Sequence, residues 1–234
     1  MATPAEVEGY KQAAAERAVA DFVQSGMVVG LGTGSTAIFA TRRIGTLLAD
    51  GTLTDIVGVP TAIATGDEAR RVGVPLLTDE VPWEIDVTID GADEVDPALD
   101  VIKGGGSALL REKLVAQASA SEVIVVDEAK RSPRLGTHVA LPIEVVAFGL
   151  ATTRQASDRL GAQVEVRRSA DGEIVSTDQG NLVLDCDFGP IEDAEALATA
   201  LTAHAGVVEH GLFLGITSAL VVSGAAGVEV IRRP

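Results

Sequence analysis

Aromatic residues and cysteine are scarce in this sequence of 234 residues. Aromatic side chains make up only 3% of it, although 47% of the residues are hydrophobic. The core must therefore be built from Ala, Val, Leu and Ile, which suits helices packed on a sheet. The single cysteine, Cys186, has no disulfide partner and no neighbours at metal-ligand spacing, so we expect a buried structural thiol.

Long apolar runs and an N-terminal targeting signal are also missing. No stretch of about 18 apolar residues occurs, and the first residues lack a basic segment followed by an apolar one. The sequence therefore predicts a cytoplasmic protein with no membrane partner.

Positive charge is in short supply. Lys and Arg number 18 against 34 Asp and Glu, which gives a formal net charge of −16. Such a surface repels nucleic acids and anionic membranes, so neither is expected as a partner. An anionic substrate would need a local cluster of cations, and the few lysines available for it are Lys11, Lys103, Lys113 and Lys130.

Apolar strands and amphipathic helices alternate over the first part of the chain. We expect strands at 27–31, 54–59, 85–90 and 123–127, and helices at 5–24, 37–48, 62–72 and 108–120. Nearly continuous apolar strands that alternate with helices predict a Rossmann-like α/β fold, with a mostly parallel sheet covered by helices. Ligands bind such sheets at the carboxyl ends of the strands.

The pattern changes after about residue 132. Strands are expected at 139–146, 163–168, 173–176, 182–185 and 207–209, and helices at 149–160 and 191–203. This order is typical of a small α+β, ferredoxin-like module. We expect a catalytic domain over 1–131 and 207–234, to which strands at 219–222 and 228–231 return, and a lid or oligomerisation domain over 132–206.

Three polar motifs follow predicted strands. The first, GLGTGST at 30–36, combines glycines that let a ligand approach the backbone with hydroxyls and N–H groups at a helix start, which suits an anion. The second, DGADEVD at 90–96, crowds carboxylates that must face cations, backbone N–H groups or substrate hydroxyls. The third, KGGGSALLREK at 103–113, places a glycine turn before a helix that carries Glu112.

Each motif also has a simpler interpretation. The first could be a glycine turn without a ligand, the second a metal site, and Glu112 a solvated helix residue. No histidine lies near the second motif, and its spacing does not match a calcium-binding loop. Together, however, the motifs predict one cleft suited to proton transfer next to the carbonyl of a phosphorylated sugar.

These motifs resemble the type A ribose-5-phosphate isomerase family. DGADEVD followed by KGGGSALLREKLVA is similar to the signature of that family, and GLGTGST is similar to its phosphate loop. The similarity continues through IVVDEAK, LPIEVV, TDQGN and VVEHGLF, so it extends over nearly the whole chain.

The resemblance implies an aldose-ketose isomerase of the non-oxidative pentose phosphate pathway, which interconverts D-ribose 5-phosphate and D-ribulose 5-phosphate through a cis-enediolate. It implies no metal or organic cofactor and a homodimer or homotetramer. The implied catalytic residues are Glu112 as general base with Asp90, Asp93 and Lys103. The implied substrate and phosphate ligands are Gly32, Thr33, Gly34, Ser35, Thr36, Gly104, Gly105, Gly106, Lys130 and Lys11.

One position departs from the family pattern. The family often has Thr-Ser after the second strand, whereas this chain has Thr61 and Ala62, so one hydroxyl is missing. Two other functions remain open, namely a sugar-phosphate-sensing binding domain and a coenzyme A transferase relative. A sensor would usually carry a DNA-binding module, for which the residues before the first strand are too few. A transferase would form a covalent glutamyl thioester, which trapping would reveal.

Overall fold

The chain forms two compact units. The computed structural model describes residues 2–78 and 82–233. Unit 1 comprises Met1–Ala92, Arg111–Lys130 and Ile216–Pro234, and unit 2 comprises Asp93–Leu110 and Arg131–Gly215. The predicted division placed 93–110 and 207–215 in the first domain, whereas both segments lie in unit 2. Strand pairing is the reason, because residues 101–102 pair with 212–213 and residues 207–210 pair with 143–145.

Unit 1 is built on a six-stranded sheet. In spatial order its strands are β13 (Gly227–Arg232), β12 (Thr217–Gly224), β6 (Glu122–Asp127), β3 (Val87–Asp90), β1 (Val28–Leu31) and β2 (Val57–Pro60). All neighbours are parallel except the β12–β13 hairpin. The predicted mostly parallel α/β sheet is confirmed, including the return of the last two strands.

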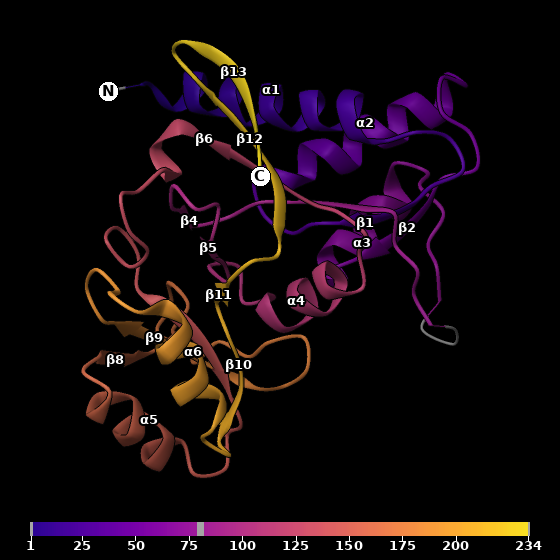
Figure 1. The fold of residues 1–234 in the computed structure, drawn as a ribbon. Coiled ribbons are helices and arrows are strands. Elements are labelled where there is room, and N and C mark those ends of the chain that lie inside the picture. The colour runs from indigo at the N-terminus through magenta and orange to yellow at the C-terminus, as the bar shows by residue number, and fades with distance from the viewer. Residues whose placement is uncertain (1, 79–81, 234) are drawn as a thin grey trace. The chain divides into compact units, whose positions relative to one another are not determined.

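Helices cover both faces of this sheet (Figure 1). The helices α1 (Pro4–Phe22), α2 (Ala37–Ala49) and α3 (Ile63–Arg71) contribute to a core with Val29 and Leu31 of β1. On the opposite face, Gly30 of β1 approaches Val115 of α4 (Leu109–Gln117). The two faces alternate along β1 as the strand pleat requires. A short 3-10 helix, Glu128–Lys130, follows β6.

Unit 2 contains an antiparallel sheet with two helices. The strands lie in the order β10 (Val207–His210), β7 (Leu141–Val145), β9 (Leu182–Asp187) and β8 (Gln163–Val166), and the helices are α5 (Leu150–Arg159) and α6 (Ala194–Thr202). A small second sheet joins β11 (Leu212–Phe213), β5 (Val101–Ile102) and β4 (Glu94–Val95). The expected α+β module is therefore present, with a second sheet that the sequence did not indicate.

Two details of unit 2 bear on the predictions. Segment 173–176 is not a strand and forms only isolated pairs, Arg168 with Ile174 and Ser176 with Leu182. Tight turns at 169–172 and 177–180 leave too few residues between them. The expectation for Cys186 is confirmed, since its side chain is fully buried in the core and burial raises the pKa of its thiol to about 12.

Among the described residues, no helix combines the length and the apolar character that crossing a bilayer requires.

Candidate active site

The glycine loop at 30–36 leaves β1 and enters α2 in unit 1. A Cβ atom on Gly30 would lie 1.8 Å from Thr88 Oγ1, and one on Gly32 would lie 2.3 Å from Asp90 Oδ1. Gly34 has a φ of +110°, which L side chains rarely adopt. Gly30 and Gly32 are therefore required because the loop backbone lies too close to β3 for a side chain, and Gly34 is required because of its backbone conformation.

Asp90 joins this loop to β3. Its side chain is fully buried, and Oδ1 accepts hydrogen bonds from the backbone N–H groups of Thr33 (3.0 Å) and Gly91 (2.7 Å). Backbone N–H groups stabilise the ionised form of a buried carboxylate. The first and second motifs thus meet in unit 1, as their position at strand ends predicts.

Two threonine hydroxyls, from the residue after β2 and from α3, support the same loop. Thr33 Oγ1 lies 2.7 Å from Thr61 Oγ1 and 2.9 Å from Thr65 Oγ1. Thr61 Oγ1 also donates to the carbonyl of Leu31 (3.0 Å). Ala62 is the N-cap of α3 and supplies no side-chain cap bond, so the departure from the family pattern falls at the N-cap position of this helix.

Two of the residues predicted to bind phosphate, Lys11 and Ser35, meet just before the start of α2. Among the residues that the structure describes, none accepts a hydrogen bond from the N–H groups of Gly34, Ser35 or Thr36. Lys11 Nζ donates to Ser35 Oγ (3.0 Å), which brings a cation from α1 to the loop. Unpaired N–H groups at a helix start beside an ammonium group suit a phosphate. Lys130 belongs to unit 1 as well and is half-buried after β6.

Glu112 lies in the first turn of α4 and is only 5% exposed. The end of α4 contacts the start of β3, because Ile85 N–H donates to the carbonyl of Ala118 (3.2 Å). The start of α4 therefore lies toward the carboxyl ends of β1 and β3. Val115, three residues after Glu112 and on the same helix face, approaches Gly30. Glu112 thus faces the sheet on the side of Gly32 and Asp90, and it is not a solvated residue.

Backbone N–H groups explain why the acidic motif tolerates its charges. Asp93 accepts from Gly105 N–H (2.7 Å), and Asp96 accepts from Ala98 and Asp100. Glu94, fully buried, accepts from three consecutive N–H groups at 136–138. Within residues 2–78 and 82–233, no group of three or more His, Cys, Asp and Glu side chains could hold a metal ion.

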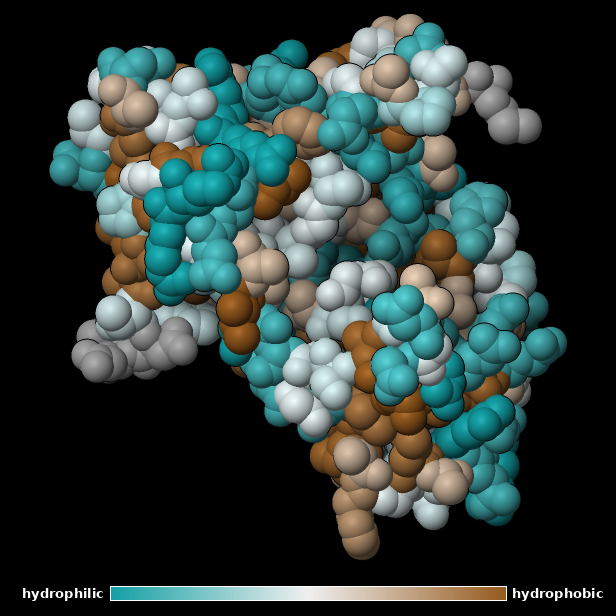
Figure 2. Space-filling model, turned by 180° about the vertical axis from the view of Figure 1, so that it is seen from behind, coloured by the Kyte–Doolittle hydropathy of each residue, from teal (hydrophilic) through white to brown (hydrophobic). Residues whose placement is uncertain are grey.

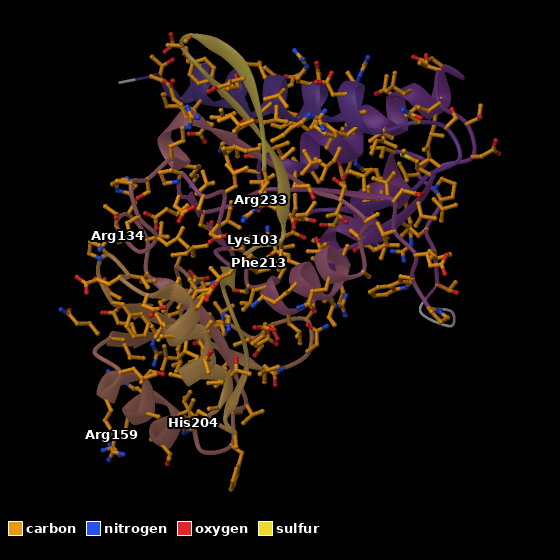
Figure 3. All side chains as sticks on the ribbon, viewed as in Figure 1. Lys103, Arg134, Arg159, His204, Phe213 and Arg233 are labelled. Carbon is orange, nitrogen blue, oxygen red and sulfur yellow. The ribbon has the colours of Figure 1, made fainter. Side chains whose placement is uncertain are left out.

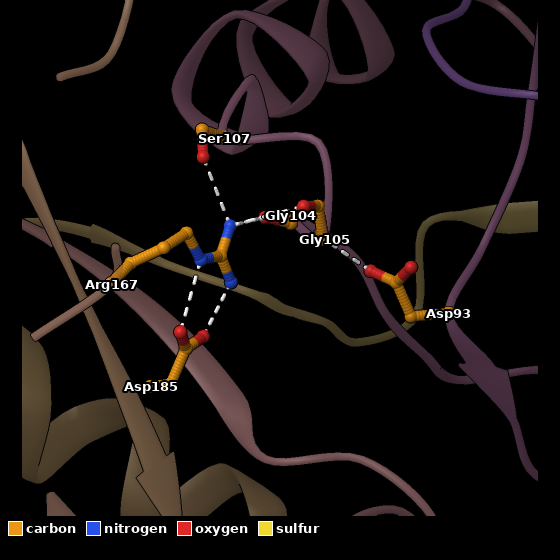
Figure 4. Close-up of polar contacts among 6 residues, drawn as sticks. All are labelled: Asp93, Gly104, Gly105, Ser107, Arg167 and Asp185. Carbon is orange, nitrogen blue, oxygen red and sulfur yellow. Dashed lines mark hydrogen bonds and ion pairs between the residues drawn. The ribbon is translucent and has the colours of Figure 1, made fainter. Parts of the chain in front are cut away.

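The third motif lies mostly in unit 2. Lys103 is 2% exposed, and its ammonium group lies 5.6 Å from the centre of the Phe213 ring (Figure 3). The glycine turn that follows is held on one side by Asp93, which accepts from Gly105 (Figure 4). A Cβ atom on Gly105 would lie 2.6 Å from Asp93 Oδ1, and Gly104 has a φ of +107°.

Arg167 of unit 2 was not predicted from the sequence. Its guanidinium group donates to the carbonyls of Gly104 and Gly105 and to Ser107 Oγ (Figure 4). No local signal could have identified it, because the contact spans about sixty residues and the neighbouring Arg168 has the same chemistry.

The predicted residues therefore form one group in each unit. In unit 1 the structure brings together Gly32, Thr33, Ser35, Asp90 and Lys11, with Glu112 on the same sheet face as Asp90. In unit 2 it brings together Asp93 and the loop 103–106. The chain passes between the units at 92–93 and at 110–111, next to these groups in sequence.

Known proteins match this chain over nearly its full length. The sequence pattern of the family described as Ribose 5-phosphate isomerase A (phosphoriboisomerase A) matches residues 57–227. A ribose-5-phosphate isomerase A of Desulfatibacillum aliphaticivorans is 52% identical over 225 residues, 96% of this chain and 97% of that protein. The chain belongs to the ribose-5-phosphate isomerase A family. A member from Chloroflexus aurantiacus is 54% identical over 95% of this chain and 92% of its own length.

Solved structures of this family have the same fold. Ribose 5-phosphate isomerase from Plasmodium falciparum matches with a TM-score of 0.93 and 40% identity, covering 96% of this chain and 98% of that one. A D-ribose-5-phosphate isomerase in complex with phospho-erythronic acid matches with a TM-score of 0.94 and 35% identity, covering 97% and 99%. The predicted family, fold class and enzyme class, a ribose-5-phosphate isomerase, are confirmed.

Proposed function

We propose that this isomerase interconverts D-ribose 5-phosphate and D-ribulose 5-phosphate through a cis-enediolate, with Glu112 as the general base. The observation that carries the proposal is the burial of Glu112 on the sheet face that also holds Asp90 and the glycine loop. Glu112 takes the proton from C2 of the open-chain aldose and returns it to C1, while the hydroxyl proton of O2 passes to O1, so that the C1 aldehyde becomes an alcohol and the C2 alcohol becomes a ketone. A carboxylate held out of water is suited to such a transfer.

The phosphate of the substrate binds the loop that begins α2. Thr33, Ser35 and Thr36 offer hydroxyls, the N–H groups of 34–36 offer donors, and Lys11 adds positive charge beside Ser35. Lys130 supplies a second ammonium group. In a chain with a net charge of −16, this local excess of cations compensates for repulsion of an anionic substrate.

Asp90, Asp93 and Lys103 assist ring opening and stabilise the enediolate oxygen. Asp90 and Asp93 are both held by backbone N–H groups, so their carboxylates are fixed in orientation. Lys103 is buried beside Phe213, and a desolvated ammonium group interacts strongly with a developing negative charge. The backbone of Gly104, Gly105 and Gly106 contacts the substrate.

Substitution of the base provides the main test. Replacing Glu112 by Gln removes the proton acceptor and keeps the shape, so kcat should fall by about a thousandfold or more while KM changes little. Glu195 is the matched control, because it also lies in the first turn of a helix and is exposed. A Glu112→Gln enzyme with the kcat of the Glu195→Gln enzyme would overturn the assignment.

The reaction needs neither a metal nor an organic cofactor in this proposal. Full activity on ribose 5-phosphate is expected after dialysis against a chelator, measured by conversion to the ketose. Activity lost on dialysis and regained with a divalent cation would contradict it.

The protein works in the cytoplasm as a homodimer or homotetramer, and unit 2 serves as the lid or assembly unit. Large apolar side chains are exposed among the hydrophilic surface residues that Figure 2 shows from one side, and Phe148 is 94% exposed. An exposed aromatic side chain of this kind can anchor an interface between two copies of the chain. Light scattering coupled to size exclusion should give at least twice the chain mass of 24.0 kDa, and replacing Phe148 by Ser should shift the protein toward a monomer. A monomer in the unsubstituted protein would contradict this assembly.

A further inference from the structure

The guanidinium group of Arg167 holds the backbone of the loop 104–107 from within unit 2. Its Nη1 donates to the carbonyl of Gly104 (2.6 Å), to the carbonyl of Gly105 (3.2 Å) and to Ser107 Oγ (3.0 Å) (Figure 4). The other side of the same group binds Asp185, through Nε to Oδ2 (3.0 Å) and through Nη2 to Oδ1. Arg167 thus connects the loop to the sheet of unit 2.

Arg167 is itself fixed before it reaches the loop. It directly follows β8, its N–H donates to the carbonyl of Val183, and Asp185 lies two residues further along β9 on the same face. Its side chain is 14% exposed, and the fork-shaped contact with the carboxylate restricts its rotation. A rigid donor of this kind can determine the orientation of the groups that it binds.

Peptide planarity transmits this constraint to the N–H groups of the loop. The carbonyl of Gly104 and the N–H of Gly105 belong to one planar peptide group, so they point in opposite directions. Arg167 binds the carbonyl end of that plane and Asp93 binds its N–H end (2.7 Å). The next peptide group consists of the Gly105 carbonyl and the Gly106 N–H. Its carbonyl accepts a hydrogen bond from Arg167, and the exposed Gly106 N–H has no hydrogen-bond partner among the described residues.

The loop needs such support because its conformation is unusual. Gly104 has a φ of +107°, and Ser107, which is not a glycine, has a φ of +60°. A left-handed conformation at a serine persists only when neighbouring contacts enforce it. The hydrogen bond from Arg167 to Ser107 Oγ is one of those contacts. Another is the turn in which the Ser107 N–H donates to the carbonyl of Gly104 (2.9 Å).

We propose that Arg167 is a positioning residue for the isomerase reaction. It fixes the two peptide planes between Gly104 and Gly106. The Gly106 N–H, and Lys103 at the start of the loop, then meet, in a single orientation, the substrate oxygen that becomes negatively charged. The proposal rests on the proposed role of the loop 103–106 in binding the substrate. Arg167 does not touch the substrate. Without it, flexible glycines would let both peptide planes rotate, and the donors would be misplaced at the moment when charge develops.

The test compares Arg167→Ala and Arg167→Lys with Arg168→Ala. Arg168 is the matched control, because it is the next residue and is exposed, and within the described part of the chain its side chain donates only to the carbonyl of Gly172 in a surface turn. For Arg167→Ala we expect a fall in kcat on ribose 5-phosphate of about a hundredfold with KM within about threefold, since a misplaced donor acts mainly in the transition state. Arg167→Lys keeps the positive charge but loses the planar guanidinium group with its several N–H donors, and its kcat should fall about tenfold.

Rescue separates positioning from a general structural role. Methylguanidinium added to the Arg167→Ala enzyme should restore at least about tenfold in kcat by occupying the vacated position, with no effect on Arg168→Ala or Glu112→Gln. If the alanine variant does not fold, Arg167→Lys decides, and unchanged kcat there overturns the proposal.

Two further results would also overturn it. One is a kcat for Arg167→Ala equal to that of Arg168→Ala. The other is an activity loss that matches the unfolded fraction and shows no rescue. Failure of the proposed function is a distinct result, namely a Glu112→Gln enzyme with full activity.

Discussion

Two glycine loops of this isomerase are supported in different ways. The loop 30–36 of unit 1 is held by Asp90, the last residue of β3, and by the hydroxyls of Thr61 and Thr65. Thr61 directly follows β2, and Thr65 lies in the first turn of α3. The loop 103–106 of unit 2 is held by Asp93 and by Arg167, which lies about sixty residues further along the chain. Both loops have an aspartate that accepts a backbone N–H, and they differ in what holds the opposite side.

This difference indicates a division of tasks. The first loop ends at the start of a helix, whose geometry directs N–H groups toward a bound anion. The glycines of the second loop lie after β5 and before α4, outside both elements, and the side chain of Arg167 supplies their orientation. We therefore expect changes at the phosphate ligands of the first loop to act mainly on substrate binding. Changes at the second loop, and at Asp90, which assists catalysis in the proposed reaction, should act mainly on turnover.

The largest effect is expected for the aspartates themselves. Asn keeps an oxygen that accepts the N–H bonds and removes the charge, so Asp90→Asn and Asp93→Asn test charge alone. Asp90 is fully buried and Asp93 is partly exposed, and a charge interacts more strongly where water is absent. We expect kcat to fall by about a thousandfold for Asp90→Asn and about thirtyfold for Asp93→Asn. Equal losses would remove this distinction.

A smaller effect is expected at the phosphate end of the first loop. Replacing Lys11 by Met removes the cation beside Ser35, and KM should rise about tenfold with kcat nearly unchanged, as for the loss of one charge-assisted hydrogen bond. Arg17 on the same helix pairs with Asp21 and serves as the control. Steady-state kinetics with ribose 5-phosphate distinguishes the two. A drop in kcat without a change in KM would contradict a role in phosphate binding.

A stabilising change is expected at Ala62. The N-cap Ala62 has no side-chain oxygen, so a serine there could accept a hydrogen bond from the N–H of Ala64 or Thr65 and should stabilise the protein by about 1 kcal/mol. Urea unfolding of Ala62→Ser measures this, with Ala64→Ser, inside the same helix, as the control. An unfolding midpoint at or below that of the control would show that the serine does not cap the helix.

The smallest effect concerns the helices that border the first loop. Glu68 of α3 binds Arg42 of α2 and Arg71, which lowers the pKa of its carboxyl from 4.5 to about 2. A lowered pKa in the folded state means that this stabilisation is complete above about pH 4.5 and is lost as the pH falls toward 2. Glu68→Gln should be less stable than the unsubstituted protein by under about 1 kcal/mol at pH 7. The difference should shrink at pH 3, and a difference that grows there would contradict it.

Most helices and strands could be predicted from the sequence, because hydrophobic periodicity reports local burial. The strands of the main sheet differ from their predicted ranges by at most a few residues, and the site motifs follow them as expected. The two-residue strands β4 and β5 were missed, since a pair of residues has no periodicity. The strand predicted at 173–176 shows the opposite error, in which the apolar pair Ile174 and Val175 suggested a strand and close turns limit the segment to isolated pairs.

The sequence by itself determined the family, the parallel sheet and the residue types needed for proton transfer, because these depend on periodicity and on ordered motifs. Only the tertiary structure decided that Glu112 is buried, that Lys11 reaches Ser35, and that Arg167 rather than Arg168 supports the loop after Lys103. Contacts between residues far apart in the chain depend on strand register, and one residue of register decides which side chain faces the loop.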